Sequence, residues 1–268
     1  ISVNQEVMPI PDDTWIIKKH KKRRPSLKSP VLIEGLPGIG NVGKIGVDFL
    51  IDELKAKALY TFNSYSFPNA VFVNEDNLIE LPEITLHHAR TNGHDLLLLA
   101  GDIQPTDEVA CYRFSEMILD LLKEFGGKEV ITTGGIGLMD VPEKPQVFCT
   151  GNNKEIIGKY KRISKVKNDI YGVVGPIVGV TGLLLGMADD YEMDAISFLA
   201  ETYGHPMYMG MKGSREILKI LIKRFDLDID LKKLEKEIKK IEKEMRKRKE
   251  DLDKMSHDKK PGTVNYIG

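Results

Sequence analysis

The sequence predicts an α/β fold, a three-layer α/β/α sandwich followed by a protruding C-terminal helix. Short apolar runs alternate with segments of helical periodicity between residues 30 and 225, and strands joined by helices of this length require parallel crossovers. Beyond residue 225 the sequence becomes rich in Lys and Glu around an apolar stripe, which is typical of a separate amphipathic helix. The predicted organisation is an N-terminal basic segment at 1–29, an α/β body at 30–225, the helix at 226–257 and a flexible tail at 258–268.

The strands and helices of the body follow from local patterns of apolar residues. The run of four leucines at 96–99 is too apolar for a half-exposed strand, so it predicts a central one. The spacing of Val109, Tyr112 and Met117 predicts a helix over 107–125, and Gly126 ends it. We expect strands near 15–17, 31–33, 58–62, 84–88, 96–99, 130–133, 147–150 and 194–200, and helices near 42–55 and 107–125.

The uncharged stretch from Ile170 to Ala188 is long enough to suggest a membrane span, since about 20 apolar residues cross a bilayer. Five glycines and Pro176 interrupt this stretch, however, and Asp189 follows it directly. This composition is atypical of a membrane helix. We therefore expect a buried glycine-rich loop and helix, and no membrane partner.

An apolar stripe runs along the predicted C-terminal helix. Its residues recur at intervals of three and four on a helix of about 40 Å, at 1.5 Å per residue. Because such a helix cannot bury its stripe alone, it must meet another helix, either within its own domain or in an intermolecular coil, and both interpretations stand. The seam consists of Leu231, Leu234, Ile238, Ile241, Met245, Leu252 and Met255.

Charge and cysteine content limit the classes of function. The chain has 39 Lys and Arg residues against 40 Asp and Glu, so no overall field attracts nucleic acid or a lipid surface. The basic run from Lys18 to Arg24 lacks interleaved aromatic residues, which weakens the interpretation as a single-strand nucleic-acid site. The run is either a solvated turn beside an edge strand or a patch for an acidic partner or nucleic acid, and we expect nucleic acid to be the less favoured partner. Two cysteines are too few for a disulfide framework, so we expect a cytoplasmic location. Scarce glutamine beside abundant Lys and Glu is typical of thermophilic proteins.

A glycine-rich segment between a predicted strand and a predicted helix matches two phosphate-binding patterns. Gly38, Gly40 and Gly43 have the dinucleotide spacing, and Gly38 with Gly43 and Lys44 has the P-loop spacing. Each pattern lacks its second requirement, because Ile45 replaces the hydroxyl that holds magnesium and no carboxylate follows the next strand to hold a ribose. Two interpretations remain: a tight turn that lets the helix pack on the sheet, or an anion-binding turn made of these glycines and Lys44.

Further glycine turns follow predicted strands at Gly101, Gly134 and Gly151. If the strands are parallel, these turns gather at their carboxyl edge, where open α/β sheets bind ligands, so we expect a shallow cleft there. The sequence contains no Ser-His-Asp spacing, no glycine-flanked nucleophile elbow and no His-rich metal pattern. We therefore expect no catalytic residues, no metal site and no cofactor.

Four segments together resemble the archaeal proteasome assembly chaperone family, whose members are homologous to a eukaryotic chaperone of the proteasome α-ring. The segments are LIEGLPGIGNVG at 32–43, GGIG at 134–137, GPIVGVTGLL at 175–184 and AETYG at 200–204. The resemblance covers about residues 30–225, and the joint occurrence of the segments is more specific than any single glycine motif.

The resemblance implies a nucleoside-phosphorylase-like fold without catalysis, ATP-independent action, a homo-oligomer with a tetramer favoured, and proteasome α-subunits as partners. Such partners often end in a hydrophobic residue, Tyr and any residue, whereas here Tyr266 is third from the end and follows Asn265. We expect the helical arm and its tail to capture α-subunits by burial of apolar side chains. The tail residues are Val264, Tyr266, Ile267 and Gly268. The alternatives are a disordered tail and, for the whole protein, an enzyme or sensor that binds a nucleoside or phosphate at the glycine turns.

Overall fold

The computed structural model describes residues 15–74, 76–172 and 175–240. The chain divides into two compact units, 1–229 and 230–268. The first unit contains a large sheet flanked by helices, and the described part of the second is a helix over 232–240.

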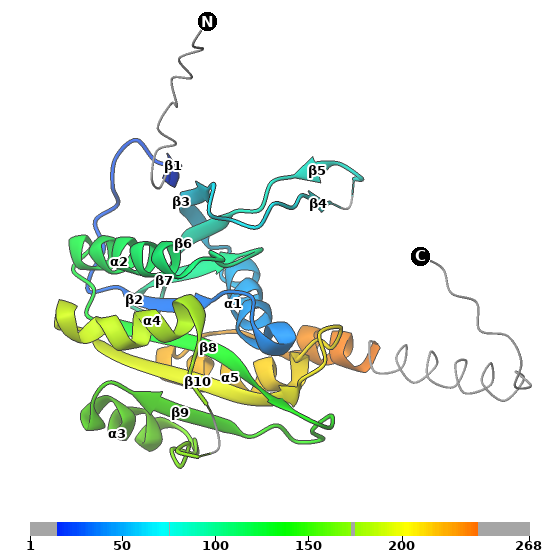
Figure 1. Ribbon diagram of the computed structural model, residues 1–268. Coiled ribbons are helices and arrows are strands. Elements are labelled where there is room, and N and C mark those ends of the chain that lie inside the picture. The colour runs from blue at the N-terminus through cyan, green and yellow to red at the C-terminus, as the bar shows by residue number, and fades with distance from the viewer. Residues whose placement is uncertain (1–14, 75, 173–174, 241–268) are drawn as a thin grey trace, which may run out of the picture. The chain divides into compact units, whose positions relative to one another are not determined.

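An eight-stranded mixed sheet forms the centre of the first unit (Figure 1). Its strand order is β1-β3-β6-β7-β2-β8-β10-β9, and all eight predicted strands are present. They are β1 (Trp15–Lys19), β2 (Val31–Gly35), β3 (Lys57–Ser64), β6 (Ile84–Thr91), β7 (His94–Gly101), β8 (Glu129–Leu138), β9 (Val147–Gly151) and β10 (Asp194–Tyr203).

The four central strands β7, β2, β8 and β10 are parallel, as predicted. The prediction of parallel crossovers is wrong for the other strands, because β1, β3, β6 and β9 each run antiparallel to a neighbour. β6 and β7 are joined by Asn92 and Gly93, and both residues have positive φ, 44° and 81°. This is the geometry of a two-residue hairpin turn, which imposes antiparallel pairing, and Asn-Gly is its sequence signal.

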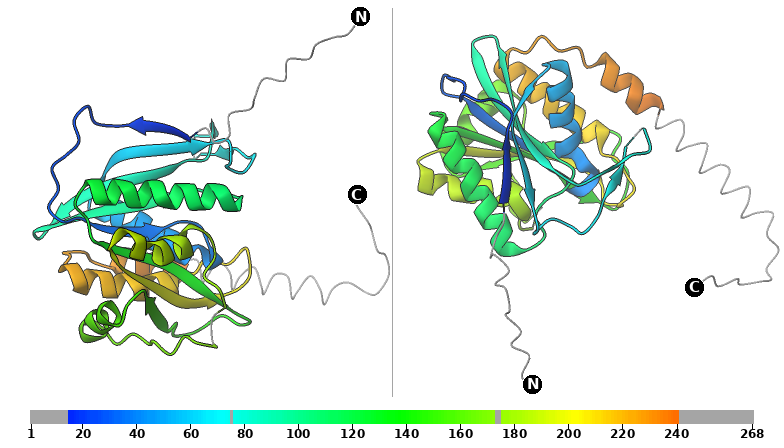
Figure 2. Two further views of the ribbon diagram at one scale, coloured as in Figure 1. Left: turned by 60° about the vertical axis from the view of Figure 1, so that its left-hand side comes forward. Right: turned by 90° about the horizontal axis from the view of Figure 1, so that it is seen from above.

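Helices cover both faces of the sheet. α2 (Glu108–Glu124) and α4 (Gly179–Met187) pack against each other on one face, and α1 (Val42–Glu53), α5 (Met211–Phe225) and α3 (Lys154–Ile163) cover the other (Figures 1 and 2). The predicted helices correspond to α1 and α2. The helix expected within 170–188 is present as α4, but the expectation that the loop before it is buried is wrong, because Tyr171 and Val178 are 101% and 79% exposed. No helix of the described residues has the length and apolar character to cross a membrane.

Aromatic side chains join strand β1 to helix α2. The ring of Trp15 stacks on that of Phe114 with centroids 5.0 Å apart, and Phe62 of β3 meets the same Phe114 edge-on at 5.5 Å. Phe62 and Phe114 are fully buried. The inward-facing Trp15 therefore anchors the outermost strand of the sheet.

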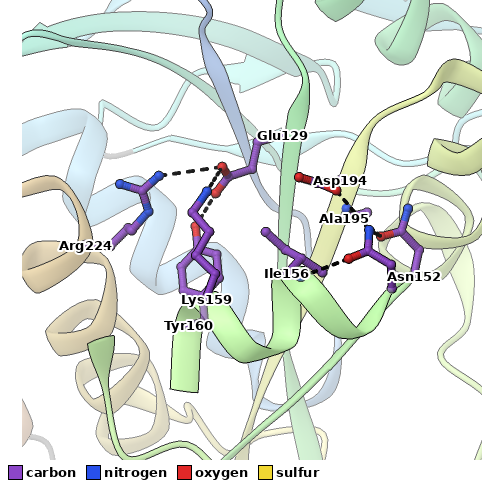
Figure 3. Close-up of polar contacts among 9 residues, drawn as sticks. Glu129, Asn152, Ile156, Lys159, Tyr160, Asp194, Ala195 and Arg224 are labelled. Carbon is purple, nitrogen blue, oxygen red and sulfur yellow. Dashed lines mark hydrogen bonds and ion pairs between the residues drawn. The ribbon is translucent and has the colours of Figure 1, made fainter. Parts of the chain in front are cut away.

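Glu129, at the amino end of β8, ties α3 and α5 to the sheet (Figure 3). Its carboxylate accepts a hydrogen bond from the hydroxyl of Tyr160 at 2.5 Å and pairs with the ammonium of Lys159 at 2.5 Å, while the guanidinium of Arg224 lies 3.6 Å away. Burial and the neighbouring Glu129 carboxylate raise the pKa of Tyr160 far above its ordinary value, so the phenol remains a donor. The cluster lies at the edge of the sheet opposite the carboxyl ends of the parallel strands, and it holds the layers together.

Asn152 lies at the same amino edge, because β9 is antiparallel to β10. Its side-chain oxygen accepts from the N–H of Ala195 at 2.9 Å (Figure 3). Its amide donates to the carbonyl of Met193 at 2.8 Å. The expectation that the Gly151 turn joins the other glycine turns at the carboxyl edge is therefore wrong.

The described part of the second unit shows the predicted apolar period. Leu234 and Ile238 are buried, Leu231 is half-buried, and most of the intervening Lys and Glu residues are exposed. The remaining seam residues, Ile241, Met245, Leu252 and Met255, and the tail residues, Val264, Tyr266, Ile267 and Gly268, lie outside the described residues.

Candidate functional site

A cavity of about 800 Å³ opens at the carboxyl edge of β2 and β8, where the sequence predicted a cleft. The helices that follow β2 and β7 lie on opposite faces of the sheet, and such a change of side is where open α/β sheets bind ligands. The volume falls within the roughly 300–1,000 Å³ of small-molecule sites. The lining is mainly apolar and includes Leu36, Ile39, Val42 and Ile177.

Three helices begin at this cavity. Asp107 caps α2 by accepting from the N–H of Ala110, whereas α1 and α4 have no such cap from the residue before them. Gln104 joins two walls, because its amide donates to the carbonyl of Pro37 at 2.6 Å and its oxygen accepts from the N–H of Val180 at 3.0 Å. The N-termini of α1 and α4 favour acceptor groups on a ligand, whereas Asp107 and Glu108 at the start of α2 line the same space and oppose an anion there.

Glu34 of β2 is fully buried next to this cavity. Its Oε1 accepts from the N–H of Leu36 at 2.9 Å and from the hydroxyl of Thr181 at 3.1 Å, and both of these residues line the cavity. Its Oε2 has no hydrogen-bond partner among the described residues. Burial raises the pKa of Glu34 to about 7. The sequence analysis missed this residue, although a charged residue next to the apolar run of a predicted central strand is a recognisable signal.

The glycine-rich turn has the geometry of the packing interpretation. A Cβ atom at Gly43 would lie 2.4 Å from the carbonyl oxygen of Thr133, and one at Gly35 would lie 2.4 Å from the carbonyl oxygen of Gly43. Gly40 has a φ of 62° and lies against Thr202. Glycine at these positions lets α1 rest directly on β2 and β8.

Of the residues in the predicted anion-binding turn, Gly38 and Gly43 line the cavity, whereas Lys44 does not. The ammonium of Lys44 pairs with Asp48 at 3.0 Å and Asp102 at 3.7 Å, and it borders a second cavity of about 460 Å³. The ammonium of Lys44 thus lies at the second cavity and not at the one that Gly38 and Gly43 line, and two carboxylates offset its charge.

The second cavity is lined by several titratable groups. The Nε2 atom of His20 lies 2.8 Å from the hydroxyl of Thr61, which lies 3.0 Å from the hydroxyl of Thr85. Burial lowers the pKa of His87 and raises that of Asp48. Within the described ranges, no group of three or more His, Cys, Asp or Glu side chains is placed to hold a metal ion.

The lining of the first cavity includes one thiol. Its thiol, Cys111, donates to the carbonyl oxygen of Pro105 at 3.3 Å. Burial raises the pKa of Cys111, which keeps the thiol in its less nucleophilic, protonated form. No histidine is present among the described residues that line this cavity, so the usual activating base is missing there.

Sequence comparison matches most of the chain to one family. The PAC2 family profile matches residues 32–249. The uncharacterized protein MJ1210 of Methanocaldococcus jannaschii is 30% identical over 223 residues, which are 82% of this chain and 83% of that protein.

Solved structures give the same result. PbaB of Pyrococcus furiosus, described as an archaeal proteasome activator, superposes with a TM-score of 0.79 and 32% identity, covering 88% of this chain and 98% of that one. PbaA of the same organism, described as an archaeal homolog of proteasome-assembly chaperone, has a TM-score of 0.71 at 23% identity, covers 90% and 94% of the two chains, and shows the fold. This chain is therefore a member of the PAC2 family, and its structural relatives include archaeal homologues of proteasome-assembly chaperones.

Proposed function

We propose that this chain is a non-enzymatic, ATP-independent partner of the proteasome that binds α-subunits and promotes their assembly in the cytoplasm. The observation that carries the proposal is the 32% identity to PbaB, a proteasome activator, over 98% of that chain. The likeness to PbaA adds a shared fold with a homologue of assembly chaperones. The chemistry of the first cavity, with its protonated thiol, agrees with a role in binding.

We infer that segment 226–268 binds the α-subunits. Val264, Tyr266 and Ile267 supply one aromatic and two aliphatic anchors, the kinds of side chain that dominate protein interfaces. If the body self-associates, as the family resemblance implied, several segments act together and raise the effective concentration at the α-subunits.

A pull-down with purified α-subunits tests this assignment. The double variant Tyr266→Ala, Ile267→Ala should capture at least tenfold less α-subunit than the unchanged chain, since buried anchors contribute more than about 1 kcal/mol each. Tyr171→Ala is the matched control, because Tyr171 is fully exposed in the first unit. Equal capture by the double variant and the unchanged chain would exclude the segment as the binding element.

Assembly and activation are separated by what is added to the assay. Mixed with unassembled α-subunits, the chain should speed ring formation, measured by native gel or light scattering. Mixed with assembled proteasomes and a fluorogenic peptide, a chain that acts in assembly alone should leave hydrolysis unchanged. An increase in hydrolysis without an effect on ring formation would assign it the activator role described for PbaB.

Small-ligand binding at the first cavity is a second candidate function, favoured by the unpartnered oxygen of the buried Glu34 beside the N-termini of α1 and α4. Phosphate, nucleosides and nucleotides should then raise the melting temperature in a saturable way. Val178, a lining residue that is 79% exposed, allows a control that spares the fold. Val178→Asp should weaken an anionic ligand by charge repulsion, whereas Val178→Thr should not. No shift at millimolar ligand would eliminate this function.

A further inference from the structure

The hairpin of β4 (Phe72–Val73) and β5 (Ile79–Glu80) has an exposed aliphatic face. Val73 and Ile79 are direct partners in the antiparallel register, so their side chains share one side of the ribbon. The alternation of side chains places Val71 and Leu81 on the same side. The exposed fraction of these four side chains ranges from 53% for Val71 to 73% for Ile79 and Leu81. Figure 1 shows the hairpin projecting beyond the eight-stranded sheet.

A ribbon with this much exposed apolar area is unfavourable in water for an isolated chain. Phe72 and Leu78 add exposed apolar area on its other side, at 42% and 63%. A two-stranded hairpin is marginally stable by itself in water, and clustered exposed apolar side chains mark interaction sites. The hairpin is therefore built to contact another molecule.

The charges around the hairpin are acidic. The sequence from Ala58 to Ala89 contains no Lys or Arg, whereas Asp76, Glu80 and Glu83 are exposed. Two hairpins packed face to face would bring like charges together, and four aliphatic side chains each do not supply the roughly 800 Å² per partner of a standard interface. The hairpin thus requires an occupant with basic as well as apolar groups.

Strand β1 offers a complementary apolar edge. It is the outermost strand of the eight and pairs with β3, so in the described sheet the backbone groups of its other side have no strand partner (Figure 2). Such an edge accepts a further strand. With Trp15 anchored inward, Ile16 and Ile17 are left 49% and 41% exposed.

The residues that continue from this edge are basic, and only Arg24 among them forms an ion pair with a described residue. Arg24 forms an ion pair with Glu124, with 2.5 Å between Nη2 and Oε2. The other cations of the run are exposed and form no ion pair with any described residue. They are Lys18, Lys19, Lys21, Lys22 and Arg23.

We propose that the β4–β5 hairpin of one copy docks on the β1 edge and the basic run of a second copy. This arrangement combines strand pairing, contact between aliphatic side chains and attraction between opposite charges. The two surfaces differ, so each copy offers both and the contact repeats until a ring closes. The proposal rests on the self-association that the proposed function invokes as a condition for several segments to act together, and it requires no contact with the proteasome.

Sedimentation velocity of the full chain, at tens of micromolar and low salt, tests the contact by charge exchange. The hairpin variant Asp76→Lys, Glu80→Lys and the edge variant Lys19→Glu, Lys22→Glu should each weaken association at least tenfold. Mixing the two variants should restore mixed oligomers, since opposite charges face each other in both contacts between unlike copies, whereas like charges meet in every contact between copies of one variant. Glu143→Lys with Glu155→Lys, two exposed positions elsewhere, is the matched control and should leave the mass unchanged.

Each possible outcome decides the proposal. An unchanged chain that is monomeric overturns it. Charge variants that form oligomers of the same mass as the unchanged chain also overturn it. If the hairpin variant weakens association and the edge variant does not, the hairpin docks on another surface, and the proposal is again overturned. Ile79→Ser should weaken association without a change in charge, and the α-subunit pull-down of the same variants is scored separately, so failure of one proposal is distinguishable from failure of the other.

Discussion

Replacing Glu34 with Gln should stabilise the protein above neutral pH and change its stability little near pH 4.5. Burial raises the pKa of Glu34 in the folded chain to about 7 from an ordinary 4.5. Between these values the folded chain keeps a proton that the unfolded chain has lost. The stability of the unchanged protein therefore falls as pH rises from 4.5 to about 7, and is constant above that. Gln cannot ionise, so this fall is absent in the variant.

The size of the effect follows from the same two values. They differ by about 2.5 pH units, and each unit corresponds to 1.36 kcal/mol, which gives about 3 kcal/mol. At low pH the two side chains are nearly equivalent. The amide oxygen of Gln can keep the bonds to Leu36 and Thr181, and its NH₂ group replaces a protonated oxygen that lacks a partner.

Guanidinium unfolding at pH 4.5 and pH 8 measures this difference. We expect the free energy of unfolding of the variant to exceed that of the unchanged chain by about 3 kcal/mol more at pH 8 than at pH 4.5. Glu155→Gln, at an exposed position of α3, is the matched control and should show no such change. A gap that is the same at both pH values would refute the assignment of a destabilising buried carboxylate.

Three further substitutions or labels test the packing. Gly43→Ala should lower the free energy of unfolding by about 1–3 kcal/mol, because the added Cβ would meet Thr133. Gly186→Ala, with open space around it, should raise that free energy by a few tenths of a kcal/mol. Chemical denaturation of both variants measures the difference. Glu129→Gln should lower the free energy of unfolding by roughly 2–3 kcal/mol, which is less than for a fully buried ion pair because Lys159 is 36% exposed. Glu216→Gln, at the half-exposed pair with Lys219, should lower it by under about 1 kcal/mol in the same assay. Cys149, whose pKa burial raises to about 11, should resist alkylation at pH 8 until the protein is unfolded; mass spectrometry showing rapid modification of the folded chain would contradict its burial.

The central strands were predictable because buried parallel strands are continuous apolar runs. The leucines at 96–99 and the run from Val31 to Ile33 leave few alternatives, and the structure places both in the middle of the sheet. The antiparallel strands were harder, since their direction depends on connections such as Asn92-Gly93 rather than on their own pattern. The β4–β5 hairpin was not predicted, because its two strands are short and their side chains face solvent.

The candidate site was predictable in place but not in detail. Glycine turns after parallel strands predicted the cleft at the carboxyl edge, and the cavity lies there. Sequence spacing grouped Lys44 with the glycines, but one helical turn directs its side chain toward Asp48 on the same helix and Asp102 after β7. Glu34 acquires its shifted pKa from the layers packed on both sides of β2, which no local pattern contains.

The proposed function requires that this PAC2 protein binds proteasome α-subunits. Isothermal titration of purified α-subunits into the full chain measures this claimed binding without any other component. We expect saturable binding with a dissociation constant in the micromolar range or tighter, and at least tenfold weaker binding for Tyr266→Ala with Ile267→Ala. The absence of saturable binding by the unchanged chain, at concentrations well above micromolar, would contradict the claim.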